Sequence, residues 1–264
     1  MLHLALAQTS FKRMVSYRAA TLAGLVTNFF FGAMRAYIFI ALYRGAGKTV
    51  VAGYSIEDAV TYTALTQAAI APLLLFGWWD VMRTIQSGDI ASDLTKPIDY
   101  YSFWLARDLG RALHDVLARG VPILLAYSLV FDIVWPGSAA AWAGFGVSAL
   151  LALLISFSWR FVVNVSAFWS TDAFGLGRVA YMSVLLLSGF LVPVAFFPDW
   201  LQGLVRLLPF PAMVNTPIEL WLGMLTGREL AAALLVQTAW VVGLAALARF
   251  AYGRGVARLA VQGG

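Results

Sequence analysis

The sequence predicts an all-α integral membrane protein with six transmembrane helices in a single domain, residues 1–264. Hydrophobic residues make up 61% of the 264 residues and charged residues only 12%, whereas soluble domains carry about a quarter charged residues. Apolar stretches long enough to cross a bilayer recur along the whole chain. With so few charges, the chain could not cover the surface of a soluble domain of this size.

The first element expected is an N-terminal helix, about residues 2–18, lying at the membrane surface. Apolar residues recur at helical spacing from Leu4 to Met14, while Lys12 and Arg13 fall on another face. This pattern is typical of an amphipathic interfacial helix. It does not fit a secretory signal, because the apolar stretch is short and the basic residues follow it.

Six segments have the length and composition of membrane-spanning helices. They are residues 19–42, 59–79, 116–135, 139–158, 179–197 and 230–248. The third is the least apolar at its ends, where Arg119 and Asp132 lie, and the fourth could continue as a helix toward Trp169. The first is interrupted by a single charge, Arg35.

Basic residues are divided unequally between the connections. With the N-terminus inside, thirteen of the 18 Lys and Arg residues fall in inside segments, four fall outside, and Arg35 lies within a span. The outside residues are Arg44, Lys48, Arg206 and Arg228. Because basic residues favour the cytoplasmic side, both termini are expected in the cytoplasm. The net charge of +5 is explained in this way, without a nucleic-acid partner.

The connection at about residues 198–229 is expected to be external but is far from polar. It carries apolar residues at Leu201, Leu204 and Leu208, and Pro209 and Pro211 break any continuous helix. We therefore predict short re-entrant helices that dip into the outer leaflet. Irregular backbone at that depth is tolerated only where it packs against protein or lines a cavity.

The stretch "SGDIASDLTKP" in the cytoplasmic connection predicts a short amphipathic helix from Ser87 to Leu94. Its acidic residues and its apolar residues each lie four positions apart, so they form neighbouring faces. A serine or acidic residue suits the start of a helix, and a proline stops it. The residues considered are Ser87, Gly88, Asp89, Ile90, Asp93, Leu94, Lys96 and Pro97. From these residues alone, a coupling element and an ordinary surface helix remain equally possible.

Three stretches together resemble the permease subunits of ABC-2-type ATP-binding cassette exporters. They are "SGDIASDLTKPIDYYSFWLARDLGR" at 87–111, "LSGFLVPVAFFPDWLQGLVRLLPF" at 187–210 and, more weakly, "AFW" at 167–169. The resemblance covers nearly the whole chain, and it is greatest to bacterial permeases whose ATPase is a separate chain.

The resemblance implies a membrane-embedded exporter subunit in the bacterial cytoplasmic membrane. It implies two copies of a separate ATPase, which bind ATP and Mg²⁺, and a second permease, identical or homologous, that completes the path. It also implies that Ser87–Pro97 is the coupling element. The substrate class it allows is an amphiphilic small molecule, a drug or a lipid. This chain itself would bind no cofactor and would not be an enzyme.

Candidates for the translocation path come from two spans. In the first span, Arg35 could contact substrate, pair with a carboxylate, or extend its charge toward the outer surface, since a charge is costly in a bilayer. In the fifth span, two small residues could permit close helix packing or line the path. The full set is Asn28, Phe29, Phe30, Arg35, Ser188 and Gly189.

Several other functions are disfavoured by the sequence. "RGAGKT" at 44–49 ends like a phosphate-binding loop, but the first glycine of that pattern is replaced by Leu42 and no strand precedes it. There are no cysteines, and the two histidines have no nearby metal-ligand partners, so no metal site is expected. An ion-coupled secondary transporter and a non-transporting scaffold remain as alternatives, although the span cores lack the carboxylates that ion coupling would need.

Overall fold

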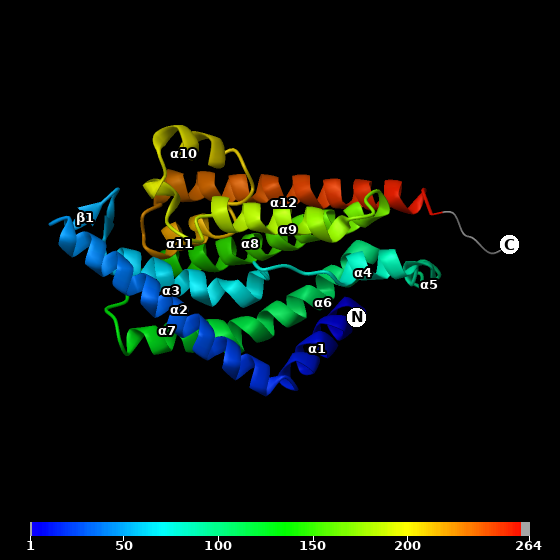
Figure 1. The fold of residues 1–264 in the computed structure, drawn as a ribbon, viewed down its shortest axis with the longest axis horizontal. Coiled ribbons are helices and arrows are strands. Elements are labelled where there is room, and N and C mark those ends of the chain that lie inside the picture. Colours follow the sequence, from blue (N-terminus) through cyan, green and yellow to red (C-terminus); the bar gives the residue numbers. More distant parts are fainter. Residues whose placement is uncertain (1, 260–264) are drawn as a thin grey trace.

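The computed structural model describes residues 2–259 and is an elongated bundle of helices (Figure 1). Three helices are long and apolar enough to cross a membrane: α2 (Arg18–Gly45), α8 (Ala139–Val165, continuing into the 3-10 turn η2, Ser166–Phe168) and α12 (Gly227–Val256). These helices confirm the predicted class, a helical membrane protein. The count of six crossings stays a prediction.

Shorter elements fill the rest of the bundle. The helices are α1 (Leu2–Val15), α3 (Ile56–Leu73), α4 (Asp80–Ser87), α5 (Ile90–Leu94), α6 (Tyr100–Asp115), α7 (Val121–Ser128), α9 (Ala173–Leu187), α10 (Asp199–Val205) and α11 (Asn215–Trp221). A π-helical turn η1 (Val116–Gly120) joins α6 to α7, and a 3-10 turn η3 (Val194–Phe196) precedes α10. The strands β1 (Val50–Val51) and β2 (Tyr54–Ser55) form a small antiparallel hairpin.

The two ends of the long axis are built differently (Figure 1). One end, here the α5 end, carries α4, α5 and the C-terminal end of α12. The opposite end, the β1 end, carries the β-hairpin, α10 and α11. The N-terminal helix α1 lies in the half nearer the α5 end, packed along α6. The chain therefore has both described termini in the same half of the molecule.

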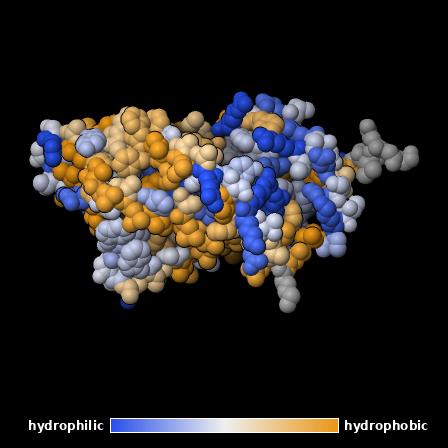
Figure 2. Space-filling view, turned by 90° about the horizontal axis from the view of Figure 1, so that it is seen from below, coloured by the Kyte–Doolittle hydropathy of each residue, from blue (hydrophilic) through white to orange (hydrophobic). Residues whose placement is uncertain are grey.

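The outer faces of the long helices are apolar. Figure 2 shows hydrophobic residues over the left and middle of one face, and hydrophilic residues gathered at the right, toward the α5 end, with a smaller group at the far left. Large exposed side chains on these helices include Leu22, Val26, Leu150, Leu235 and Val242. A continuous apolar surface of this kind is stable in lipid and not in water.

The helix of the second predicted span, residues 59–79, is shorter than expected. It begins at Ile56, where Ser55 and Asp58 form a capping box with hydrogen bonds of 3.1 and 2.9 Å. It ends at Leu73, one residue after Pro72, and Leu74 adopts a positive φ of 49°. Proline removes one backbone donor from the last turn. Side chains from other helices bind the carbonyl groups of the last three residues of α3, as described below.

The third predicted span, residues 116–135, is displaced toward the N-terminus. Helix α6, η1 and α7 form one nearly continuous rod that begins at Tyr100 and ends at Ser128. Residues 129–138 are not helical. Their backbone is held instead by side chains, since the Val134 amide donates to Thr61 Oγ1 (2.9 Å) and the Val134 carbonyl accepts from Trp221 Nε1 (2.7 Å).

The fifth predicted span, residues 179–197, is not one helix. Helix α9 starts at Ala173, where Asp172 caps it, and ends at Leu187. The chain then unwinds, with a positive φ of 85° at Gly189. The connection 198–229 contains two short helices, as expected, of which α11 packs against α8. Their re-entry into a leaflet stays a prediction.

Candidate functional site

The predicted coupling helix Ser87–Leu94 is two helices rather than one. Gly88 lies between α4 and α5 with a φ of 81°, a left-handed conformation that glycine adopts without strain. Ser87 ends α4 instead of starting a helix, and its hydroxyl donates to Asp89 Oδ2 at 2.7 Å. The prediction of one continuous helix is therefore wrong, and a tight helix–turn–helix projects from the bundle in its place (Figure 1).

Ile90 anchors this hairpin to the bundle. Its side chain is fully buried in a cluster that includes Tyr100 of α6, Phe161 of α8 and Ala248 of α12. The expectation that Ile90 forms an outward apolar face is wrong, because α5 folds back onto the chain's own core. Burying such a side chain stabilises the hairpin by about 1.5–3 kcal/mol.

The other residues of the predicted coupling element remain at the surface. Asp93 is partly buried and pairs with Lys96 at 2.6 Å. Leu94 is 40% exposed, although the α5 end around it is hydrophilic. The exposed members are Ser87, Gly88, Asp89, Leu94, Lys96 and Pro97. They form one contiguous outer side of the α4–α5 hairpin, which no other described element covers.

Behind the hairpin lies a buried ionic cluster that the sequence only partly predicts. Asp108 of α6 pairs with Arg160 of α8 at 2.7 Å and with Arg111 at 2.9 Å. Arg111 also pairs with Asp115 at 2.7 Å. The spacing of the α6 residues predicts their local pairs, but Arg160 is 52 positions away and its role becomes visible only in the fold.

This ionic cluster also binds the end of α3. Arg111 donates to the carbonyl groups of Ala71 and Pro72, both at 2.8 Å. Ser156 of α8 donates to the Leu73 carbonyl at 2.8 Å. These carbonyls have no partner within α3 because the helix stops there. Helices α3, α6 and α8 are thus tied together at one point, on the side of the bundle nearer the α5 end.

Arg35 lies in a protein-lined environment formed by three elements. Its Nη1 donates to the Phe190 carbonyl at 2.8 Å, and its Nη2 donates to Thr66 Oγ1 and, at 3.5 Å, to the Thr63 carbonyl. Its guanidinium also lies 5.2 Å from the centroid of the Phe190 ring. Among the described residues no carboxylate pairs with it, so its charge is held by neutral acceptors. The prediction that Arg35 contacts substrate stays untested.

Ser188 and Gly189 form the unwound segment that Arg35 contacts. The Tyr62 hydroxyl of α3 donates to the Gly189 carbonyl at 2.7 Å, and the backbone N–H of Asn215 donates to the Ser188 carbonyl at 3.1 Å. A Cβ on Gly189 would approach the Tyr62 hydroxyl to 2.5 Å. These two residues therefore serve close packing between α3, the unwound segment and α11. Both residues lie close in the chain to Phe190, the residue of the unwound segment to which Arg35 donates a hydrogen bond.

The remaining path candidates lie elsewhere on α2. Phe29 packs edge-on against Tyr127 of α7, with ring centroids 5.2 Å apart. Phe30 is 64% exposed on the outer surface, and Asn28 is half-buried. None of the three joins the Arg35 cluster. Their role in the path stays a prediction.

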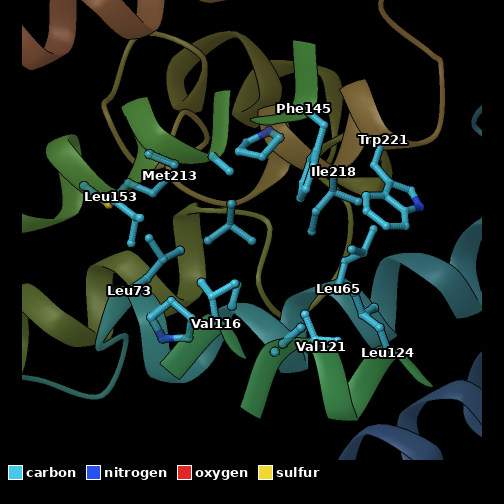
Figure 3. Close-up of a pocket in the computed structure, with 18 of the residues that line it drawn as sticks. Leu65, Leu73, Val116, Val121, Leu124, Phe145, Leu153, Met213, Ile218 and Trp221 are labelled. Atoms are coloured by element: carbon cyan, nitrogen blue, oxygen red, sulfur yellow. The ribbon is translucent and has the colours of Figure 1, made fainter. Parts of the chain in front are cut away.

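An apolar pocket of about 380 Å³ lies between α3, the η1–α7 segment, α8 and α11 (Figure 3). Leu65 and Leu73 line it from α3, Phe145 and Leu153 from α8, and Ile218 and Trp221 from α11. The lining is almost entirely hydrocarbon and aromatic. Sequence reasoning misses this pocket, because its residues come from distant segments that are individually ordinary core residues.

The segment "RGAGKT" begins with the last two residues of α2, Arg44 and Gly45, and is followed by the two-residue strand β1. A phosphate-binding loop instead joins a strand to a helix. Within residues 2–259 there is also no cluster of three or more His, Asp or Glu side chains that could hold a metal ion.

The helical bundle, its apolar outer faces and its long apolar helices define an integral membrane protein. A family model described as "ABC-2 family transporter protein" matches residues 6–263. The chain therefore belongs to the ABC-2 transporter family. Neither the curated proteins nor the solved structures contain a match to this chain.

Proposed function

We propose that the chain is the membrane-spanning permease subunit of an ATP-driven exporter. The observation that carries the proposal is the family match over residues 6–263, combined with an exposed hairpin that is anchored to the bundle. The chain itself hydrolyses no ATP in this proposal. A separate ATPase, present in two copies, binds ATP and Mg²⁺ and moves the permease.

The α4–α5 hairpin is the proposed contact with that ATPase. Its outer side presents Asp89, Leu94 and Lys96 to a partner. Its inner side is fixed by Ile90 to α6, α8 and α12. A displacement of the hairpin would be passed on to the bundle because Ile90 is fully buried among these helices, and close-packed protein interiors transmit strain.

The proposed route for that movement runs through the ionic cluster. Arg111 and Arg160 connect α6 and α8 to the end of α3. Helix α3 in turn carries Tyr62 and Thr66, which contact the unwound segment and Arg35. In this proposal the α5 end is linked to the middle of the bundle through the apolar cluster around Ile90, the ionic cluster and helix α3.

In this proposal the chain crosses the membrane six times, with both termini and the α5 end in the cytoplasm. Two permeases, identical or homologous, form the path for an amphiphilic small molecule, drug or lipid. The apolar pocket between α3 and α11 supports an apolar component in the substrate, because a hydrocarbon-lined cavity favours hydrocarbon groups.

The test is to purify the tagged chain from a native membrane and reconstitute what comes with it. We expect an ATPase of the ATP-binding cassette class at one copy per permease, with ATP hydrolysis stimulated by an amphiphile. Transport driven by an ion gradient, with no ATPase bound, would instead identify a secondary transporter. Absence of both an ATPase and transport would identify a scaffold.

A further inference from the structure

A second pocket, separate from the apolar one, opens where α1, α2, α6 and η1 meet. Its volume is about 360 Å³. Its charged lining residues are Arg13, Asp80, Arg107, Asp108, Arg111 and Arg119. Apolar and aromatic side chains complete its wall, including Met14, Tyr17 and Trp104. We refer to it as the arginine pocket.

The arginine pocket has an excess of positive charge. Asp108 and Arg111 are already paired within the ionic cluster, with Arg160 and Asp115 as their other partners. Within residues 2–259, the other three arginines of the pocket form no ion pair with a carboxylate. They are Arg13, Arg107 and Arg119. The single carboxylate that remains, Asp80, balances only one of these three charges.

Two of these arginines are held in place while part of each guanidinium stays free. Arg107 stacks over the Trp104 ring, with its Cζ 4.6 Å from the ring centroid. A cation–π contact of this kind uses none of the N–H groups of the guanidinium as hydrogen-bond donors. Arg119 donates to the Ala20 carbonyl at 3.4 Å, and its guanidinium lies against Gly24, where a Cβ would touch it at 3.4 Å.

The surface beside the pocket is apolar. Leu117, Val121 and Leu125 follow one another at helical spacing along η1 and α7 and are 55%, 42% and 54% exposed. On α2, Leu22 and Val26 are 63% and 71% exposed. Leu117 and Val121 lie two residues on either side of Arg119, and Leu22 lies two residues after Ala20, which also lines the pocket. A cationic pocket therefore lies next to a hydrocarbon surface long enough to accept acyl chains.

We propose that the arginine pocket binds the phosphate of an anionic phospholipid from the leaflet in which α1 lies. Arginine side chains bind phosphate oxygens through two parallel hydrogen bonds, and basic pockets between membrane helices recognise anionic headgroups. The acyl chains lie along the exposed side chains of α2 and α7. The bound lipid joins α1 and α6 to the start of α2. This inference rests on the placement of the chain in a membrane and does not depend on an ATPase.

The inference is tested by lipid binding to the purified chain in detergent, measured by native mass spectrometry. The probes are phosphatidylglycerol, phosphatidylcholine with the same acyl chains, and inorganic phosphate. We expect phosphatidylglycerol to bind at least tenfold more tightly than phosphatidylcholine, and inorganic phosphate at millimolar concentration not to displace it. Equal binding of the two lipids, or displacement by phosphate, would overturn the proposal.

Variants locate the site. Arg107→Gln combined with Arg119→Gln should weaken phosphatidylglycerol binding about tenfold, whereas Arg107→Lys with Arg119→Lys should retain part of it because the charges remain. The matched control is Arg206→Gln with Arg228→Gln, which removes two exposed arginines at the other end of the molecule. Arg13→Gln alone changes an exposed side chain, so the fold is preserved, and it should weaken binding severalfold. Unchanged binding in Arg13→Gln and in the double glutamine variant would contradict the inference.

Discussion

The carboxylate of Asp108 on α6 lies 2.7 Å from the guanidinium of Arg160 on α8, and both side chains are almost completely buried. The two residues are 52 positions apart, and each comes from a helix that also contacts the end of α3. The pair therefore fixes the relative position of three helices. It also allows two charges to lie inside a bundle whose exterior is apolar.

Breaking this pair should be costly. Asp108→Asn leaves Arg160 buried without a counter-charge, which typically destabilises by about 3–5 kcal/mol. The measurement is the thermal unfolding midpoint of the detergent-solubilised protein. The matched control is Asp93→Asn, which removes the partly buried partner of the exposed Lys96 at 2.6 Å and should cost less than about 1 kcal/mol. Equal effects of the two substitutions would show that the buried pair does not hold the helices.

Substitutions on the α4–α5 hairpin should separate the contact with the ATPase from folding. Asp89→Arg reverses an exposed charge on the outer side, so we expect normal expression with loss of ATPase association and of stimulated hydrolysis. Ile90→Asp instead places a charge in the buried cluster, so the yield of folded protein itself should fall.

The matched control for the hairpin is Asp199→Arg, which makes the same change at an exposed position at the β1 end. It should leave ATPase association and hydrolysis unchanged. If Asp89→Arg retains full association, the contact lies on another part of the α5 end. If Ile90→Asp folds normally, the anchoring role described for Ile90 is wrong.

The orientation of the chain can be tested with single cysteines, because the natural chain has none. Lys48 and Lys96 are both exposed and lie at opposite ends of the molecule. In intact cells, Lys48→Cys should react with an impermeant thiol reagent and Lys96→Cys should react only after the membrane is opened. Reaction of Lys96→Cys alone in intact cells would mean that the orientation is inverted.

Arg35 should be needed for the integrity of the unwound segment. Arg35→Leu leaves the carbonyl of Phe190 and the hydroxyl of Thr66 without their donor, and an unsatisfied buried group costs about 1–3 kcal/mol. Membrane insertion should remain normal, because a charge is removed from an apolar helix. Unfolding midpoints and transport should both fall, whereas Arg44→Leu at the exposed end of α2 should leave them unchanged. A stable and fully active Arg35→Leu would show that this side chain is dispensable.

Gly189 should tolerate no side chain. Gly189→Ala combines a positive φ of 85° with a close approach to Tyr62 and Asn215. Gly53→Ala is a matched control, since Gly53 has a φ of 86° and no atom within 4 Å of an added Cβ. We expect the unfolding midpoint to fall more for Gly189→Ala than for Gly53→Ala, and the difference isolates the steric contribution. Equal shifts would mean that only backbone strain matters.

Helix boundaries are where prediction from the sequence was least accurate. The helix predicted over 59–79 ends at Leu73, where Arg111 and Ser156 bind its last carbonyl groups. The helical rod that ends at Ser128 begins in the charged stretch of α6. In the sequence, the charged residues of α6 make this segment look too polar for the interior of a membrane bundle. In the structure they pair with each other and with Arg160. Hydropathy averaged over neighbouring residues cannot detect the pair of Asp108 with Arg160, because these two residues are 52 positions apart.

Local composition was enough to predict a helical membrane protein that resembles ABC-2 permeases. Each helix forms its own backbone hydrogen bonds, and each apolar stretch is stable in lipid or in the core whatever the rest of the chain does. The anchoring of the hairpin by Ile90, the binding of Arg35 to the unwound segment after α9 and the two pockets became visible only in the folded chain. Each of these depends on contacts between residues far apart in the chain, which hydropathy and spacing do not specify.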